Sequence, residues 1–242
     1  MESIFVNTES YYKVTFSRDG HSFLSMLGVI TKPYDQSLVS LLTPAELKIA
    51  EKYTGTRYSE FVHSRYITKK AVQNLMPDTP LNNIQVLKGV FEQPVLEISH
   101  GSASYDVSVS HKDNIAASLV FPHYHPAGID IDVVTPQNMK ALNRMLTAHE
   151  QHICGEYSER KMAIYTAKEA LSKIMKCGLT VPVHFLEVNA LQKEETFYSG
   201  VFTNFCQYQF ISFASGDHIL TMVFPKNSKC TIEPLFLQFV NR

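Results

Sequence analysis

The stretch Ile164-Tyr-Thr-Ala-Lys-Glu-Ala-Leu-Ser-Lys-Ile-Met-Lys-Cys-Gly-Leu179 decides how the rest of the chain is interpreted. Its residues are mostly good helix formers and Gly178 supplies a C-terminal stop, so the pattern predicts a helix. Because a helix has 3.6 residues per turn, Tyr165, Glu169 and Lys173 lie along one side of it, while apolar residues can face a core. The helix therefore presents a carboxylate beside an ammonium group. This is either an ordinary surface ion pair or part of a functional site.

Upstream, the segment Gly128-Ile-Asp-Ile-Asp-Val-Val134 alternates between apolar and acidic residues. In a strand, residues two apart share a face, so Asp130 and Asp132 project together while the apolar residues face inward. Two neighbouring carboxylates repel each other unless a cation neutralises them, and crowded oxygen ligands suit Mg²⁺ or Mn²⁺. The alternative is a strand with an acidic exposed face.

Two polar residues end the strand pattern at residues 105–111, namely Ser110 and His111. Residues 115–121 return as a second strand, which predicts a hairpin with its turn at residues 112–114. The end of a strand is a common place for ligand contacts, although a lone histidine is more often structural.

Two helices are predicted in the first half of the chain. Thr43-Pro-Ala-Glu46 has the pattern of a capping box and predicts a short helix that ends near Tyr53. Apolar residues at helical spacing predict a second helix over residues 57–76. This helix carries three cations that could line a phosphate site or form a solvated basic face: Arg57, Arg65 and Lys69.

The remaining segments mix both kinds of element. Strands are expected within residues 3–31 and at 84–87 and 94–98, and a linker at 122–126. Residues 136–163 are mostly helical in pattern, with a capping box at Thr147-Ala-His-Glu150. A meander of strands is expected at residues 181–188, 197–202, 206–213 and 219–224.

The composition limits the class of protein. The chain has 242 residues, 45% of them apolar, and 22 basic residues against 23 acidic ones give a net charge of −1. This balance offers no global charge for nucleic-acid or membrane binding, so a polyanion site must be a local cluster. Because Cys154, Cys177, Cys206 and Cys230 lack CxxC spacing and no signal peptide or membrane span is evident, we expect buried free thiols in a soluble cytoplasmic protein.

In this order the motifs resemble the 4′-phosphopantetheinyl transferases, in particular the longer single-chain type. The matching segments are residues 42–46, 57–70, 107–111, 128–132 and 165–173. The resemblance implies an α+β fold of two similar lobes related by a pseudo-twofold axis, each an antiparallel sheet with a long helix packed on it. It implies that residues 1–122 form the lobe that contacts coenzyme A phosphates and residues 127–242 the lobe with the metal and catalytic residues.

The resemblance also assigns roles residue by residue. The implied ligands of Mg²⁺, or of Mn²⁺ in its place, are Asp130, Asp132 and Glu169. The implied catalytic residues, which would approach the pyrophosphate and the carrier serine, are Lys168, Glu169 and Lys173. The implied contacts to the phosphates of coenzyme A are Arg57, Arg65, Lys69, Ser110 and His111.

Three positions depart from the family pattern. Asp132 stands where Glu is commoner, Tyr165 where Trp is usual, and Gln93-Pro94 where Gly-Lys-Pro is usual. The shorter Asp132 leaves room for a water between its carboxylate and the metal. None of the three departures removes a charge that the chemistry needs.

The implied reaction transfers the 4′-phosphopantetheine arm of coenzyme A to a serine of an apo acyl, aryl or peptidyl carrier protein and releases adenosine 3′,5′-bisphosphate. Glu169 is the candidate base for the serine hydroxyl, and Lys173 the candidate stabiliser of the attacked phosphate. We expect a monomer with no nucleic-acid or membrane partner. Two alternatives are a Mg²⁺-dependent phosphodiesterase that acts on coenzyme A and a non-catalytic scaffold that binds carrier domains.

Overall fold

The opening strands form one long hairpin. The computed structural model describes residues 8–31, 35–99, 104–233 and 236. Within them, β1 (Thr8–Arg18) and β2 (His21–Thr31) are rich in β-branched and aromatic residues and pair antiparallel along their whole length. They join β5 (Tyr105–Lys112), β6 (Ile115–Pro122) and β12 (Lys229–Ile232) in a five-stranded sheet of order β12-β1-β2-β6-β5.

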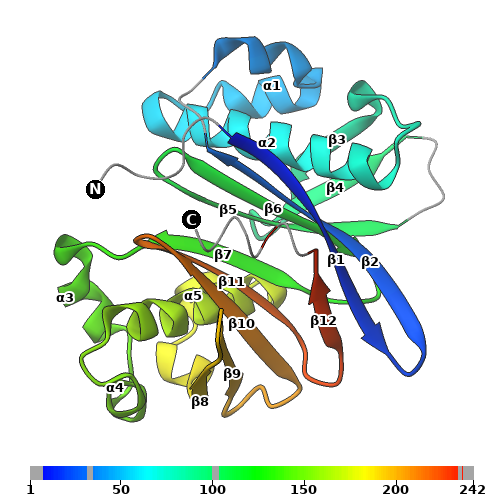
Figure 1. The fold of residues 1–242 in the computed structure, drawn as a ribbon. Coiled ribbons are helices and arrows are strands. Elements are labelled where there is room, and N and C mark those ends of the chain that lie inside the picture. Colours follow the sequence, from blue (N-terminus) through cyan, green and yellow to red (C-terminus); the bar gives the residue numbers. More distant parts are fainter. Residues whose placement is uncertain (1–7, 32–34, 100–103, 234–235, 237–242) are drawn as a thin grey trace.

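Helices cover this first sheet (Figure 1). The Thr43 hydroxyl accepts from the Glu46 backbone N–H, and the Glu46 carboxylate accepts from the Thr43 N–H, so the predicted capping box begins α1 (Pro44–Ala50). The long helix α2 (Gly55–Leu75) packs on β2 and β6. The short elements around it are the 3₁₀ helices η1 (Gln36–Leu41) and η2 (Leu81–Asn83) and the hairpin β3 (Ile84–Lys88) with β4 (Pro94–Ile98).

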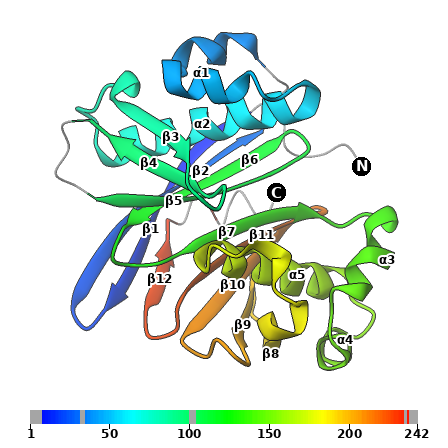
Figure 2. The ribbon, with the colours of Figure 1, turned by 180° about the vertical axis from the view of Figure 1, so that it is seen from behind.

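The second half repeats this kind of arrangement. After β7 (Gly128–Val133) come α3 (Pro136–Arg144), α4 (Ala148–Cys154) with the predicted cap at Thr147, and α5 (Ser158–Ile174). The strands β8 (Val188–Lys193), β9 (Tyr198–Phe202), β10 (Tyr208–Ser215) and β11 (His218–Pro225) then complete a five-stranded antiparallel sheet of order β7-β11-β10-β9-β8. Helix α5 lies on this sheet, as Figure 2 shows from behind.

The strand predicted over residues 181–188 is wrong. After the 3₁₀ helix η3 (Gly178–Thr180), that segment forms a second 3₁₀ helix, η4 (Val183–Leu186), and the strand begins only at Val188. Pro182 has no backbone N–H to contribute to a ladder and has a fixed φ, so it interrupts the apolar run that suggested a strand.

The two halves share a core at their junction. One cluster of buried apolar side chains takes Val14 and Leu119 from the first sheet and Ile129 and Met222 from the second. The C-terminal strand β12 pairs with β1, so the end of the chain returns to the first sheet. Strands β5 and β7 are edge strands of different sheets and lie next to each other across the junction (Figures 1 and 2). The α+β class is confirmed, and the boundaries at residues 122 and 127 stay a prediction.

The predictions about membrane spans and cysteines can be compared with the structure. In the part that the structure describes, no helix is both long and apolar enough to cross a membrane. The four cysteines are free, as expected, but only Cys154 is buried and Cys206 is exposed. The apolar run at residues 235–240 also has a strand-like pattern in the sequence, and it lies outside the described residues apart from the buried Phe236.

Candidate active site

Helix α5 and strand β7 meet at Asp130. Lys173 Nζ donates to Asp130 Oδ1 and to the carbonyl oxygen of Ile129, both at 2.8 Å. The helix approaches the strand so closely that a Cβ on Gly128 would lie 2.2 Å from the carbonyl oxygen of Ala170. A glycine is therefore required at this position, and the Gly-Ile-Asp motif sets both the close packing and the position of the carboxylate.

Glu169 lies one turn before Lys173 on the predicted polar side of α5. The hydroxyl of Tyr165 donates to Glu169 Oε1 at 3.1 Å, so the predicted alignment of these residues along the helix is confirmed. Burial raises the pKa of Glu169 above its ordinary value, and the negative charge of Asp130 raises it further, while Lys173 opposes both effects. A carboxylate with a raised pKa is a stronger base than an exposed glutamate.

Strand β5 holds β7 in place through side chains. The Ser108 hydroxyl accepts from the Ile129 N–H at 3.0 Å, and the Ser110 hydroxyl accepts from the Ile131 N–H at 3.2 Å. These bonds satisfy backbone donors on an edge strand that would otherwise be open. The Ser110 hydroxyl also donates to Asp130 Oδ1 at 2.6 Å, so in this structure it positions the aspartate.

The second aspartate is paired with a lysine from β5. Lys112 Nζ lies 2.8 Å from Asp132 Oδ1, and the Val133 N–H donates to the same oxygen at 2.7 Å. Lys112 follows the Ser-His pair that the sequence indicates, two residues after Ser110 on the same face of β5. Sequence reasoning missed it, although this alternation together with two acidic residues on β7 was the signal that could have found it.

The carboxylates suit a divalent cation by their chemistry. Asp130 and Asp132 both raise the pKa of Glu169, so the three negative charges act on one another. The hydrogen bonds of these carboxylates within the described residues use Asp130 Oδ1, Asp132 Oδ1 and Glu169 Oε1, so the second oxygen of each is a candidate cation ligand. No group of three or more His, Cys, Asp or Glu side chains in the described part of the chain is arranged to hold a metal ion, and the predicted ligand set stays a prediction.

His111 faces a basic pocket on the first sheet's side of the junction. A cavity of about 390 Å³ is lined by three of the predicted phosphate contacts, Arg57, Arg65 and His111, together with Glu60 and Lys88. His111 Nδ1 lies 3.5 Å from Glu60 Oε1. Burial lowers the pKa of His111 and the positive charge of Lys173 lowers it further, against the pull of Glu60 and Asp130, so the imidazole is mostly neutral at pH 7.

Arg65 is the most constrained cation of this pocket. Its Nε donates to the carbonyl oxygen of Val86 at 3.2 Å, and its guanidinium lies 4.0 Å from the centre of the Phe61 ring. Burial lowers the pKa of Arg65 to about 10, which still leaves it positively charged at neutral pH. Arg57 is exposed at the pocket rim and is free to follow a ligand.

A second, larger cavity adjoins the basic pocket. It measures about 680 Å³ and lies between β5 and the C-terminal end of α5, with Lys173 in its wall. The two cavities share Glu92, Pro94 and Val109, so they form one cleft along the junction of the two sheets. Lys173 thus joins the cleft to Asp130.

Two of the predicted lysines are buried structural residues. Lys69 Nζ lies 2.7 Å from Glu46 Oε2, and Lys168 Nζ lies 2.5 Å from Glu150 Oε2; each lysine is 1% exposed. Neither lines the cleft, so the structure does not bring Lys69 or Lys168 to the other predicted site residues. The capping boxes are visible in the sequence, but the ion pairs that their glutamates make are not.

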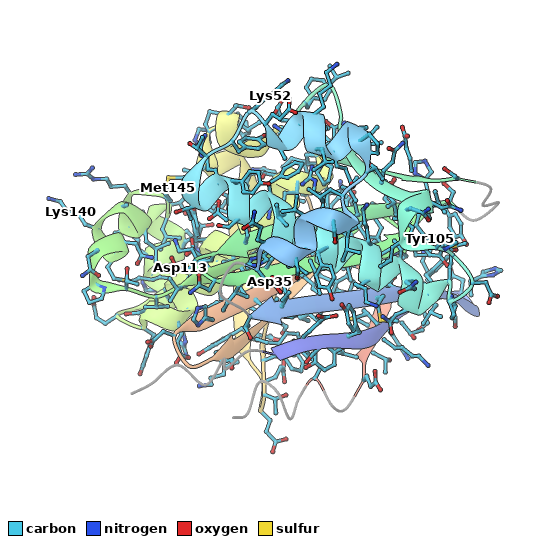
Figure 3. The ribbon with its side chains drawn as sticks, turned by 90° about the horizontal axis from the view of Figure 1, so that it is seen from above. Asp35, Lys52, Tyr105, Asp113, Lys140 and Met145 are labelled. Carbon is cyan, nitrogen blue, oxygen red and sulfur yellow. The ribbon has the colours of Figure 1, made fainter. Side chains whose placement is uncertain are left out.

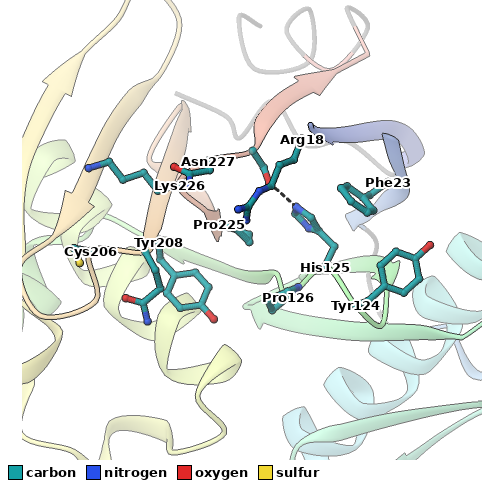
Figure 4. A pocket seen from close by; sticks show the side chains of 12 residues that line it. Arg18, Phe23, Tyr124, His125, Pro126, Cys206, Tyr208, Pro225, Lys226 and Asn227 are labelled. Carbon is teal, nitrogen blue, oxygen red and sulfur yellow. Dashed lines mark hydrogen bonds between the residues drawn. The ribbon is translucent and has the colours of Figure 1, made fainter. Parts of the chain in front are cut away.

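A further pocket lies where the chain passes between the two halves (Figure 4). It has a volume of about 560 Å³, and none of the predicted site residues lines it. His125 is buried in its wall, stacked on Phe16 with ring centroids 4.5 Å apart, and its Nε2 lies 2.9 Å from the Ser228 hydroxyl. We place this pocket outside the candidate active site.

Two holo-(acyl-carrier-protein) synthases are among the solved structures that match this chain. One, from Bacillus anthracis str. Ames in complex with CoA (3′,5′-ADP), is 19% identical over 47% of this chain and 96% of its own, with a TM-score of 0.36. The other, from Thermotoga maritima, is 17% identical over 55% of this chain and 74% of its own, with a TM-score of 0.34. No curated protein matches the chain.

A family model gives the more specific result. The model described as 4′-phosphopantetheinyl transferase superfamily matches residues 126–223. This range runs from the start of β7 into β11 and contains Asp130, Asp132, Glu169 and Lys173. Over residues 126–223 the chain therefore carries the pattern of the 4′-phosphopantetheinyl transferase superfamily. This confirms the resemblance to the superfamily and the enzyme class predicted from the sequence, while the longer single-chain type stays a prediction.

Proposed function

We propose that this chain transfers the 4′-phosphopantetheine arm of coenzyme A to a serine of an apo acyl, aryl or peptidyl carrier protein, releasing adenosine 3′,5′-bisphosphate. One observation carries the proposal above the others. Asp130 accepts both from Lys173, which also lines the cleft, and from Ser110 of the opposite sheet. A carboxylate fixed by both sheets, next to a cleft with basic residues, suits a cation that would neutralise the pyrophosphate of coenzyme A.

The residues have different roles along the cleft. Arg57, Arg65 and His111 bind phosphate groups at its basic end, as charges or as a neutral hydrogen-bonding imidazole. Lys173 lies where the cleft meets Asp130 and stabilises charge on the attacked phosphate. Lys69 and Lys168 support the site through the fold.

The chemical step moves one proton and one phosphoryl group. The oxygen of the carrier serine forms a bond to the phosphorus that bears the pantetheine, and the bond from that phosphorus to the bridging oxygen breaks, so the electron pair leaves on adenosine 3′,5′-bisphosphate. Glu169 takes the serine proton, which its raised pKa favours. Mg²⁺ held by Asp130 and Glu169, with Asp132 nearby, would supply neutralisation of the pyrophosphate charge.

We also propose that the two halves are pseudo-twofold lobes and that the chain acts as a monomer. Two features support this: the order strand, helices, hairpin and second hairpin occurs twice, and each half has a buried Lys–Glu pair in the same place. One chain supplies both walls of the cleft, so no second copy is needed. Sedimentation of the active protein tests the monomer.

The deciding experiment incubates the purified chain with coenzyme A, Mg²⁺ and an apo carrier protein and weighs the carrier by mass spectrometry. We expect a gain of one phosphopantetheine. No gain with several unrelated apo carriers would contradict the proposal. Release of phosphopantetheine in the absence of any carrier would instead identify a phosphodiesterase.

A further inference from the structure

Lys112 occupies an unusual place for a lysine beside a proposed cation site. It is the last residue of β5, and its ammonium group contacts Asp132 Oδ1 across the junction at 2.8 Å. The side chain of Asp132 is 18% exposed and that of Lys112 34% exposed, so the pair is partly shielded from water. Such shielding makes the pair stronger than a fully exposed one.

The backbone around this pair is fixed by neighbouring contacts. Ser108, Ser110 and Lys112 lie on one face of β5 and contact successive residues of β7. The two serine contacts fix the register of β5 against β7, and this register places Lys112 opposite Asp132. The Val133 N–H adds a second donor to the oxygen that Lys112 contacts.

The charges show what the lysine does for the site. Asp130, Asp132 and Glu169 carry three negative charges, and the two lysines that contact them, Lys112 and Lys173, carry two positive charges. Lys173 shares Asp130 with Ser110, so Asp130 is oriented from two directions, whereas Asp132 pairs with Lys112 and also interacts electrostatically with His218. A cation that bound through Asp132 would have to displace Lys112 or accept its repulsion.

We propose that Lys112 is a positioning residue that holds Asp132 as its own partner, so that Asp130 and Glu169 are the carboxylates that bind the divalent cation. The inference rests on the magnesium site of the proposed function and narrows it. Lys112 thereby sets the cation affinity of the site from the opposite sheet.

The test measures cation binding without catalysis. Mn²⁺ binding to the purified chain, in the absence of coenzyme A and carrier, is followed by electron paramagnetic resonance and by calorimetry for Lys112→Gln, Asp132→Asn, Asp130→Asn and the double variant Lys112→Gln/Asp132→Asn. Lys140→Gln is the matched control, since Lys140 on α3 points away from the body of the protein (Figure 3). Thermal melting of every variant checks that it is folded.

The expected changes in Mn²⁺ affinity distinguish a residue that binds the cation directly from one that only carries a charge nearby. Lys112→Gln should bind Mn²⁺ about five-fold more tightly because a nearby positive charge is removed. Asp130→Asn should weaken binding at least about thirty-fold, as the loss of a direct ligand does. The double variant removes one charge of each sign and should stay within about two-fold of the unmodified chain.

Three outcomes would overturn the inference. In the first, the double variant binds Mn²⁺ about ten-fold more weakly than the unmodified chain, which would make Asp132 a direct ligand. In the second, Lys112→Gln binds Mn²⁺ with unchanged affinity. In the third, neither the unmodified chain nor Lys112→Gln binds Mn²⁺. Carrier modification is measured separately. A chain that binds Mn²⁺ as expected but modifies no carrier would remove the proposed function and leave the role of Lys112 intact.

Discussion

Helices α2 and α5 each contain an equivalent buried Lys–Glu ion pair, yet α5 carries the catalytic candidates Glu169 and Lys173, whereas α2 contributes arginines to the basic pocket. In the first half Lys69 donates to the carbonyl of Leu41 and pairs with Glu46; in the second Lys168 donates to the carbonyl of Met145 and pairs with Glu150. Each glutamate comes from a capping box and also accepts a strand N–H through its other oxygen. Both oxygens of each glutamate accept a hydrogen bond, and each ammonium also donates to a backbone carbonyl, which is the condition under which buried charges are tolerated.

The halves diverge at the residues next to this shared structure. After the buried lysine comes Lys70 in α2 but Glu169 in α5. The strand that each helix covers contains Gly28-Val-Ile30 in the first half and Gly128-Ile-Asp130 in the second. Ile30 is buried among Ile67 and Ala116, whereas Asp130 meets Lys173. The two halves thus share a buried Lys–Glu pair and differ at the candidate site by two charged residues, Glu169 in place of Lys70 and Asp130 in place of Ile30.

The largest expected effect is on the rate of carrier modification and comes from Glu169, the residue after the buried Lys168. Glu169→Gln should lower the rate of carrier modification on the order of a thousandfold, because the variant cannot accept the serine proton and loses a charge toward the cation. Lys70→Gln, at the corresponding place in α2, is the matched control and should change the rate less than about two-fold. Mass spectrometry of the carrier over time measures both. Equal effects would mean that the two halves do not differ as the geometry indicates.

The buried lysines give the next largest effect, and it is on stability. Lys168→Met and Lys69→Met each leave a buried glutamate without its ionic partner, so each should lower the free energy of unfolding by about 3–5 kcal/mol. Urea unfolding measures the loss. If Lys168→Met unfolds like the unmodified chain but transfers no phosphopantetheine, then Lys168 acts directly in the reaction and the parallel with Lys69 fails.

Local patterns in the sequence predicted the helices, their caps and the carboxylates. The capping boxes at Thr43 and Thr147 and the alternation around Asp130 depend on residues within one turn or one strand, so short-range rules suffice for them. The contacts that a long side chain makes depend instead on elements that are far apart in the sequence. The family resemblance assigned Lys168 to the pyrophosphate, and nothing local in the sequence showed that this lysine would be buried against Glu150.

The contacts between β5 and β7 could not be predicted for the same reason. Periodicity shows that Ser108, Ser110 and Lys112 share a face, but it does not show which edge strand that face meets. The return of β12 to the first sheet is equally non-local, since it follows from pairing with β1 at the other end of the chain. The apolar run around Pro182 misled the strand prediction, because such a run is compatible with a buried strand and with a 3₁₀ turn alike.

Substitution of the β5 serines should have an intermediate effect. It separates residues that stabilise only the fold from residues that also position the site. Ser108→Ala and Ser110→Ala each remove the acceptor for a buried N–H of β7 and should each cost about 1–2 kcal/mol of unfolding free energy. Only Ser110→Ala also frees Asp130, so it alone should slow transfer, by about ten-fold. Urea unfolding and carrier mass spectrometry on both variants check this. Equal rates in the two variants would show that Asp130 needs no support from the first sheet.

The smallest effect concerns His125, which joins the halves away from the cleft. Burial lowers its pKa below the ordinary histidine value, so the folded chain resists the proton that the unfolded chain binds near pH 6.5. Stability should therefore be full above that pH and fall as the pH drops, with a slope of at most about 1.4 kcal/mol per pH unit from this group.

His125→Phe keeps an aromatic ring between Phe16 and Phe23 but cannot titrate, and it loses the contact with Ser228 (Figure 4). Between pH 7.5 and pH 5.5 the unfolding free energy of this variant should fall about 1 kcal/mol less than that of the unmodified chain, although its value at pH 7.5 is lower by the lost hydrogen bond. Urea unfolding at both pH values measures the difference. Because the apolar cluster beside His125 contains residues of both sheets, the two halves should unfold in one transition, and the effect of this single histidine should appear in all of it. Two separate transitions, with the pH effect confined to one of them, would show that the halves fold as independent units.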